Sequence, residues 1–195
     1  EINAGTDDAT DIVVGDNGYA DYDNDGDMNL ITTDVPATGG KDIIHVGDGA
    51  DIVLGGADED TITAVAGSNI VLGDNGFVDY ISDDMNNEDI DFVWSSDFAI
   101  GARDIITTGG GDDIIIGGTA DDEVAAGDGK NIVIGDSGKI TAADANTPRF
   151  GQQPLTLGLV ETTAYGVGDA DDIEIKNCTL YENALGFQTY NPGAW

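Results

Sequence analysis

The feature that most constrains this chain is a repeat of nine residues. The repeat runs without a gap through residues 37–72 and 99–134, and single copies fit at 6–14 and 166–174. A short fixed period is typical of solenoids, in which each repeat builds part of a coil and contacts only its neighbours. The chain is therefore expected to form a stack of coils rather than a domain with an irregular core.

Two positions of the repeat carry a constant chemistry. In all ten copies the sixth position holds an oxygen-bearing side chain, namely Asp11, Asp42, Asp51, Asp60, Asn69, Asp104, Asp113, Asp122, Asn131 and Asp171. The eighth position holds a β-branched aliphatic residue in each of them: Val13, Ile44, Val53, Ile62, Val71, Ile106, Ile115, Val124, Val133 and Ile173. Because β-branched residues favour strands, each repeat is expected to be an acid-bearing turn followed by a short strand.

These repeats resemble the RTX calcium-binding nonapeptide repeats, which have the pattern G-G-x-G-x-D-x-U-x with a large aliphatic residue at U. The copy GGADEDTIT at 55–63 departs from the pattern only at Asp58, whereas the copy at 64–72 keeps a single glycine in its turn. The resemblance implies an all-β fold, a parallel β-roll or β-solenoid in which two repeats complete a coil of about 18 residues. It also implies that the turns bind several calcium ions.

The sixth-position side chains suit calcium, which takes roughly six to eight oxygen ligands from carboxylates and backbone carbonyls. Alternate repeats lie on the same side of a roll, so Asp51 is expected to stack on Asn69, and Asp113 on Asn131. Two carboxylates about 5 Å apart repel by roughly 3 kcal/mol at an effective dielectric constant of 20, and Asn in one of them softens that repulsion. The alternative, in which these residues only cap their own turns, leaves the repulsion along the stack unneutralised.

The charge balance limits the partners. Asp and Glu number 39 against 6 Lys and Arg, which gives a formal net charge of −33. Such a chain repels phosphate and anionic membranes, and no apolar run is long enough for a membrane span, so we expect neither nucleic acid nor membrane insertion. The single Cys178 and the single His45 argue against a disulfide and a zinc site. Without cations, the same composition predicts disorder.

The repeat is interrupted three times, and each interruption follows GDNG or GDSG. We expect a solenoid over residues 1–174 with insertions near 19–36, 77–98 and 139–165, followed by a C-terminal cap or assembly segment over 175–195. A cap or joint is expected because the end of a solenoid exposes unpaired strand edges.

The first insertion contains a second calcium motif. Asp21, Asp23 and Asp25 precede Gly26 in the D-x-D-x-D-G spacing of a calcium loop, and the carbonyl of Asp27 can add a ligand. An acidic, solvated turn is the alternative. In the second insertion, Asp79 follows GDNGFV as Asp21 follows GDNGYA, which indicates one shared ligand.

One expected sheet has an apolar outer face. In a strand, the seventh and ninth positions of the repeat point opposite to the eighth. Alternate repeats carry Ile, Val or Leu at all three positions, at 52–54, 70–72, 114–116 and 132–134. Because an apolar stripe of that length is unusual on a soluble monomer, we expect the insertions or a neighbouring chain to cover it.

The expected function is that of a calcium-dependent structural module of an extracellular surface protein, as an adhesin stalk or a subunit of a filament or layer. Chains of this kind can polymerise or associate laterally. A glycan-binding adhesive module is the main alternative, because aromatic residues gather in the insertions. A β-solenoid polysaccharide lyase or epimerase is less favoured, because six scattered basic residues offer little to a developing carbanion. We therefore expect no catalytic residues.

Overall fold

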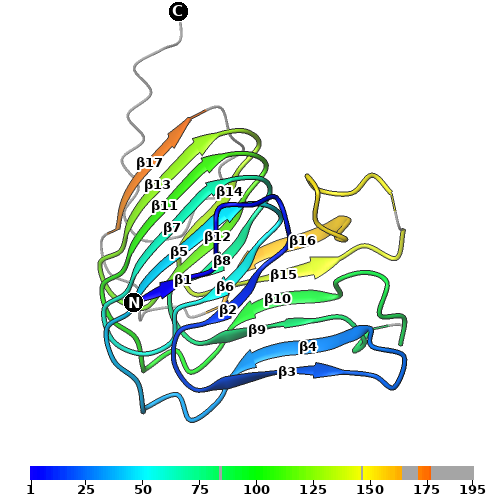
Figure 1. Ribbon diagram of the computed structural model, residues 1–195, viewed down its shortest axis with the longest axis horizontal. Coiled ribbons are helices and arrows are strands. Elements are labelled where there is room, and N and C mark those ends of the chain that lie inside the picture. The colour runs from blue at the N-terminus through cyan, green and yellow to red at the C-terminus, as the bar shows by residue number, and fades with distance from the viewer. Residues whose placement is uncertain (84, 146, 164–170, 177–195) are drawn as a thin grey trace, which may run out of the picture.

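The computed structural model describes residues 1–83, 85–145, 147–163 and 171–176. Within these residues the chain forms seventeen strands and no helix, and the strands make three sheets (Figure 1). The expected all-β fold class is confirmed. The segment expected to cap the solenoid or to join chains lies almost entirely outside the described residues.

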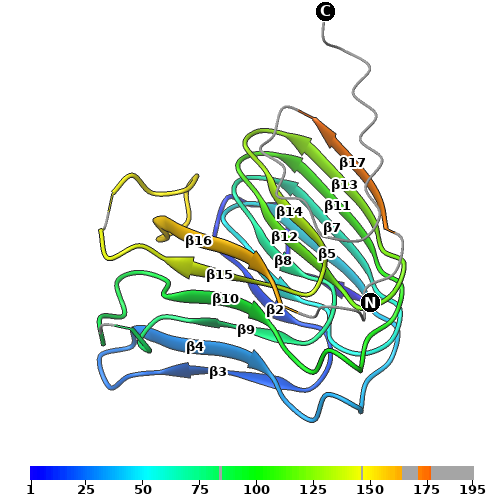
Figure 2. The same ribbon diagram turned by 180° about the vertical axis from the view of Figure 1, so that it is seen from behind.

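Two parallel sheets form the solenoid, and the chain passes alternately from one to the other (Figures 1 and 2). Sheet A has the order β1 (Ile2–Asn3), β5 (Ile43–Asp48), β7 (Thr61–Ala66), β11 (Ile105–Gly110), β13 (Glu123–Asp128) and β17 (Asp172–Lys176). Sheet B has the order β14 (Ile132–Asp136), β12 (Ile114–Gly118), β8 (Ile70–Leu72), β6 (Ile52–Leu54) and β2 (Ile12–Val14). Each pair of repeats thus supplies one strand to each sheet, as expected for a β-roll.

The eighth position of the repeat faces the inside of the roll. In sheet A, Ile62 is in register with Ile44 and Ile106, and in sheet B, Val71 is in register with Val53 and Ile115. All of these side chains are buried and belong to one hydrophobic cluster between the two sheets. Full burial of each such side chain contributes roughly 1.5–3 kcal/mol, so the constant eighth position supplies the spine of the coil.

The three insertions build a third sheet, which is antiparallel. Sheet C has the order β16 (Leu157–Thr162), β15 (Gly138–Ala142), β10 (Phe92–Ser95), β9 (Gly76–Asp79), β4 (Met28–Thr33) and β3 (Gly18–Tyr22). Each insertion supplies one pair of adjacent strands, and the three pairs lie side by side along the solenoid (Figures 1 and 2). The insertions, which lack the nine-residue repeat, therefore form one continuous layer.

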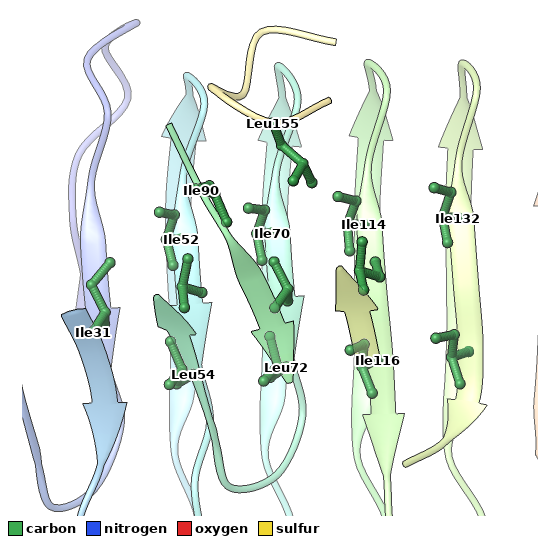
Figure 3. Packing of buried hydrophobic residues seen from close by; sticks show 14 of the residues in the cluster. Ile31, Ile52, Leu54, Ile70, Leu72, Ile90, Ile114, Ile116, Ile132 and Leu155 are labelled. Atoms are coloured by element: carbon green, nitrogen blue, oxygen red, sulfur yellow. The ribbon is translucent and has the colours of Figure 1, made fainter. Parts of the chain in front are cut away.

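Sheet C covers the apolar outer face of sheet B. Ile31, Val78, Val93 and Ile140 are aligned across four strands of sheet C and are all fully buried. They share a second hydrophobic cluster with the seventh- and ninth-position residues of sheet B, and Figure 3 shows Ile52, Leu54, Ile70, Leu72, Ile114, Ile116 and Ile132 facing this layer. Ile90 and Leu155, from the insertion loops, complete the cluster. The expectation that the insertions fold back over this face is confirmed.

Candidate metal centre

The sixth-position side chains lie in two columns along the roll. The first column precedes the strands of sheet A and consists of Asp42, Asp60, Asp104, Asp122 and Asp171. The second column precedes the strands of sheet B and consists of Asp11, Asp51, Asn69, Asp113 and Asn131. Because the coils are in register, each column places one such side chain directly beside the next.

In the first column, each backbone N–H donates a hydrogen bond to the Oδ1 atom of the next coil. The N–H of Asp42 donates to Asp60 at 2.8 Å, and that of Asp60 donates to Asp104 at 2.8 Å. The N–H of Asp104 donates to Asp122 at 2.8 Å, and that of Asp122 donates to Asp171 at 3.0 Å. One oxygen of each acceptor carboxylate is thereby held in place by the backbone.

The second column repeats this arrangement. The N–H of Asp11 donates to Oδ1 of Asp51 at 2.8 Å, and the N–H of Asp51 donates to Oδ1 of Asn69 at 3.2 Å. The N–H of Asn69 donates to Asp113 at 2.9 Å, and that of Asp113 donates to Asn131 at 3.0 Å. The expected stacking of Asp51 on Asn69 and of Asp113 on Asn131 is confirmed.

The second oxygen of many of these carboxylates is buried without a partner. Among the described residues, the Oδ2 atoms that are buried and accept no hydrogen bond are those of Asp51, Asp60, Asp104, Asp113 and Asp122. Burial of a carboxylate oxygen without compensation is strongly unfavourable, and it becomes tolerable when the oxygen coordinates a metal. The orphan atoms therefore fit a cation in the turns.

Backbone oxygens of neighbouring coils lie beside the orphan atoms of the first column. A Cβ atom added to Gly73 would lie under 3.0 Å from both Oδ2 of Asp104 and the carbonyl oxygen of Gly117. The same holds at Gly117, where Oδ2 of Asp122 and the carbonyl oxygen of Gly135 come equally close. A carboxylate and a backbone carbonyl thus converge in each turn, and both are ligands that calcium prefers.

Burial raises the pKa values of the acids in the first column. Burial first, and then the charges of neighbouring carboxylates, raise the pKa of Asp60 to about 7, that of Asp104 to about 10 and that of Asp122 to about 9. In the second column, burial likewise raises the pKa values of Asp51 and Asp113. Without a cation, these groups therefore favour the protonated form, and a bound cation would hold them ionised.

Aspartates at the start of the insertions tie neighbouring turns together, which the sequence analysis did not foresee. Oδ1 of Asp16 accepts the N–H of Gly40 at 2.9 Å, and its Oδ2 accepts the N–H of Ala57 in the next coil at 2.6 Å. Asp74 accepts the N–H groups of Ala102 and Thr119 in the same way. In the sequence, the Gly-Asp pair that opens each GDNG or GDSG segment is the pattern that could have identified these aspartates.

These aspartates also add charge to the first column. The Asp74 side chain is buried, and its burial raises its pKa to about 7. Its charge raises the pKa values of Asp104 and Asp122, and the charge of Asp16 raises those of Asp42 and Asp60. Asp16 and Asp74 therefore add carboxylate groups, and with them negative charge, to those of the sixth-position residues in the first column.

The acidic segment of the first insertion forms the turn between β3 and β4. Oδ1 of Asp23 accepts the N–H groups of Asp25, Gly26 and Asp27 at 2.8–3.0 Å, and these bonds, that from Asp27 most strongly, lower the pKa of Asp23. Oδ2 of Asp21 accepts a hydrogen bond from the Asn29 amide. The hydrogen bonds define an Asx-type turn, and calcium binding at Asp21, Asp23, Asp25 and Asp27 stays a prediction.

Asp79 occupies the same row of sheet C as Asp21, because Leu30 is in register with both. The side chain of Asp79 accepts hydrogen bonds from the Ile81 and Ser82 backbone and from the Ser82 hydroxyl. Its role as a ligand also stays a prediction. In the part of the chain that the structure describes, no three His, Cys, Asp or Glu side chains converge on one point, so backbone oxygens are needed to complete any metal site.

The comparisons with known proteins agree with this geometry. Residues 36–71 and 101–139 match the family model of the RTX calcium-binding nonapeptide repeat, in four copies. No curated protein and no solved structure matches the chain. A search of the described residues for a helix able to cross a membrane finds none.

The matched segments contain the turns of both columns from Asp42 to Asn69 and from Asp104 to Asn131. Repeats of this family are typical of secreted proteins, and they bind calcium ions. Over these two segments the chain consists of RTX calcium-binding nonapeptide repeats, and its cofactor is calcium, bound as several ions.

Proposed function

We propose that the chain is a calcium-dependent structural module of an extracellular surface protein, as an adhesin stalk or as a subunit of a filament or layer. The observation that carries the proposal is the set of buried Oδ2 atoms without partners, of which those of Asp60, Asp104 and Asp122 lie beside backbone carbonyls of the next coil. Calcium between the coils would neutralise them. The roll then becomes stable only where calcium is plentiful.

The location outside the cell follows from the same dependence. Extracellular calcium modules work with dissociation constants of about 10⁻⁴ to 10⁻³ M, which cytosolic calcium does not reach. With a net charge of −33, the chain would repel itself in the cytosol. It would be at most marginally folded there and would coil fully after export, and the rigid roll would then act as a spacer or building block.

A structural role is favoured over catalysis because of where the basic side chains lie. Lys41 forms an ion pair with Glu59, and Arg103 forms one with Glu123 at 2.7 Å. A third basic group, the ammonium of Lys139, lies 4.2 Å from the centre of the Trp94 ring. These three of the six Lys and Arg residues are already engaged at separate places, which leaves little to stabilise an anionic transition state.

Circular dichroism of the purified chain with calcium and with excess chelator tests the proposal. We expect a strong β-sheet signal with calcium, and after chelation a much weaker signal that is lost at a lower temperature. Electron microscopy of the calcium-loaded sample then separates the two structural roles, because filaments indicate a polymer subunit and single rods indicate a spacer. A chain that stays equally folded after exhaustive chelation would contradict the proposal.

A second candidate function is supported by the outer face of sheet C. Tyr19, Phe77 and Trp94 lie in one row across its strands, on the face opposite to the buried row. Tyr19 is 51% exposed, and the rings of Phe77 and Trp94 lie 5.6 Å apart between centroids. Aromatic rings on a sheet suit stacking against a neutral sugar, which supports an adhesive, glycan-binding role.

Lys139 limits this candidate, since its ammonium lies over the rings of Phe92 and Trp94. A glycan would have to bind beside it or displace it. Binding of the calcium-loaded chain to an array of neutral glycans tests the idea, with Tyr19→Ala and Phe77→Ala as variants. Binding that both variants leave unchanged would exclude this surface.

A further inference from the structure

The two columns differ in which residue types occupy the sixth position of the repeat. The first column has Asp in every coil, whereas the second column has Asn69 and Asn131 in place of Asp. Both Asn side chains are completely buried, so neither amide is satisfied by water. Their hydrogen bonds therefore decide what the turns of the second column can bind.

Each Asn orients its amide through the column itself. Oδ1 of Asn69 accepts the N–H of Asp51, and Oδ1 of Asn131 accepts the N–H of Asp113. The other end of each side chain is then the NH₂ group, which can only donate. An Asn amide thus stands where an Asp in the first column carries its orphan Oδ2 atom.

Both NH₂ groups use backbone carbonyls of the turn. Nδ2 of Asn131 donates to the carbonyl of Gly127 at 2.8 Å, and Nδ2 of Asn69 donates to that of Gly67 at 3.2 Å. Nδ2 of Asn69 also donates to Oδ1 of Asp113 at 3.0 Å. These carbonyls are oxygens that a calcium ion could otherwise coordinate, and the amide hydrogens repel a cation.

We infer that the two columns bind calcium unequally. In the turns of Asn69 and Asn131, the side-chain NH₂ group occupies the place of the ion and bonds the carbonyls that the ion would otherwise bind. The first column binds calcium at the turns of Asp60, Asp104 and Asp122, because these residues retain buried, unpartnered Oδ2 atoms. The second column binds calcium only where Asp51 and Asp113 retain theirs. This inference rests on the calcium-dependent fold proposed above.

The unequal columns have a structural consequence. At its Asn turns the second column is closed by hydrogen bonds within the chain, so this edge of the roll needs fewer ions. The first column lacks such amides and carries the added charge of Asp16 and Asp74. Calcium is therefore expected to stabilise mainly the edge of the roll that carries the first column, which is the edge from which the insertions leave.

The test uses the full chain and counts bound calcium by equilibrium dialysis with metal analysis. The double variant Asn69→Asp, Asn131→Asp is expected to bind up to two more ions than the parent chain. Its thermal midpoint is expected to rise in saturating calcium and to fall in chelator. The opposite change, Asp104→Asn in the first column, is the matched control and is expected to lose one ion. An unchanged count in the folded double variant would overturn the inference.

A second variant covers the case in which the double variant does not fold. Asn131→Ala removes the amide from the Gly127 carbonyl, and its thermal midpoint is expected to fall equally with calcium and with chelator. A fall seen only with calcium would mean that Asn131 serves as a ligand, and would overturn the inference. If the parent chain itself binds no calcium, the proposed function fails; if it folds with calcium but the variants behave otherwise, only the inference fails.

Discussion

The backbone N–H of Asp60 donates to Oδ1 of Asp104 at 2.8 Å, although the two residues are 44 positions apart. An entire insertion lies between them, and the column continues across it with the same bond that joins Asp104 to Asp122, which are 18 positions apart. Asp74, at the start of the insertion, accepts N–H groups from Ala102 and Thr119, in the two turns that follow the insertion. The insertion therefore leaves the roll and returns to it without breaking the hydrogen bonds of the first column.

Asp60→Asn tests the role of a single orphan oxygen. In calcium, the variant is expected to be less stable by about 1–3 kcal/mol, because a charged ligand is replaced by a neutral one. In chelator it is expected to be no less stable than the parent chain, because a buried carboxylate beside other acids has been removed. Thermal or urea unfolding in both conditions measures the two effects.

The matched control for this experiment is Asp58→Asn, two residues away on an exposed position of the same turn. Asp58 has a φ angle of 74°, which Asn tolerates well. The control is expected to change stability little in either condition. Equal behaviour of the two variants would contradict a specific role for Asp60.

Gly73→Ala tests whether space in the turn is needed for an ion. The added methyl group would collide with Oδ2 of Asp104 and with the carbonyl of Gly117, the two oxygens that converge there. We expect a loss of at least one bound calcium ion and a higher calcium concentration at the midpoint of calcium-induced folding. Gly40→Ala is the control, because nothing lies within 4 Å of its added methyl group. Retention of all ions by Gly73→Ala would argue against a site at this turn.

Much of the roll could be predicted from the sequence, because its residues follow a nine-residue repeat. The spacing of Asp42 and Asp60 fixes one coil, and the β-branched residues two positions later fix which side is buried. The pairing of Asp60 with Asp104 across an insertion is seen only in the structure. Stacking of Asp51 on Asn69 followed from the same period and is confirmed.

The rest could not be predicted, because it depends on contacts outside the repeat. The insertions have no shared period, so the register that aligns Val78 with Ile31 and Val93 could not be read from them. The bonds of Asp74 depend on how the chain returns after an insertion, and no local pattern specifies that path. The donor role of Asn131 appears only once Oδ1 is seen to accept a neighbouring N–H.

The layer formed by the insertions should contribute directly to stability. Ile140 of sheet C is fully buried against sheet B, and Ile140→Ala is expected to lower the free energy of unfolding by about 2–4 kcal/mol. Leu159→Ala on the neighbouring strand is the control, since Leu159 is 53% exposed. Urea unfolding in saturating calcium measures both. Equal, small effects would mean that sheet C packs only loosely on the solenoid.

The pH dependence of the calcium-free chain follows from its raised pKa values. Burial raises the pKa of Asp104 to about 10 and that of Asp122 to about 9, above the ordinary value of 3.8 that applies in the unfolded chain. The folded state therefore binds these protons more tightly, and this stabilisation is complete below the unfolded pKa and is lost as pH rises through the folded values. Without calcium, the thermal midpoint is expected to be higher at about pH 5 than at about pH 8.

With saturating calcium the order should reverse, because calcium binds the ionised carboxylates and protons compete with it. Thermal scans by circular dichroism at both pH values, with calcium and after its removal, measure the four midpoints. A calcium-free chain that is more stable at the higher pH would contradict the assignment of these acids as buried and unneutralised.

The most direct measurement is a crystal structure of the calcium-loaded chain with anomalous diffraction. We expect a separate ion about 2.3–2.6 Å from Oδ2 of each of Asp60, Asp104 and Asp122, with backbone carbonyls of the adjoining coil completing each site. A folded roll in which these oxygens contact only water or protein, with no ion between the coils, would contradict this expectation.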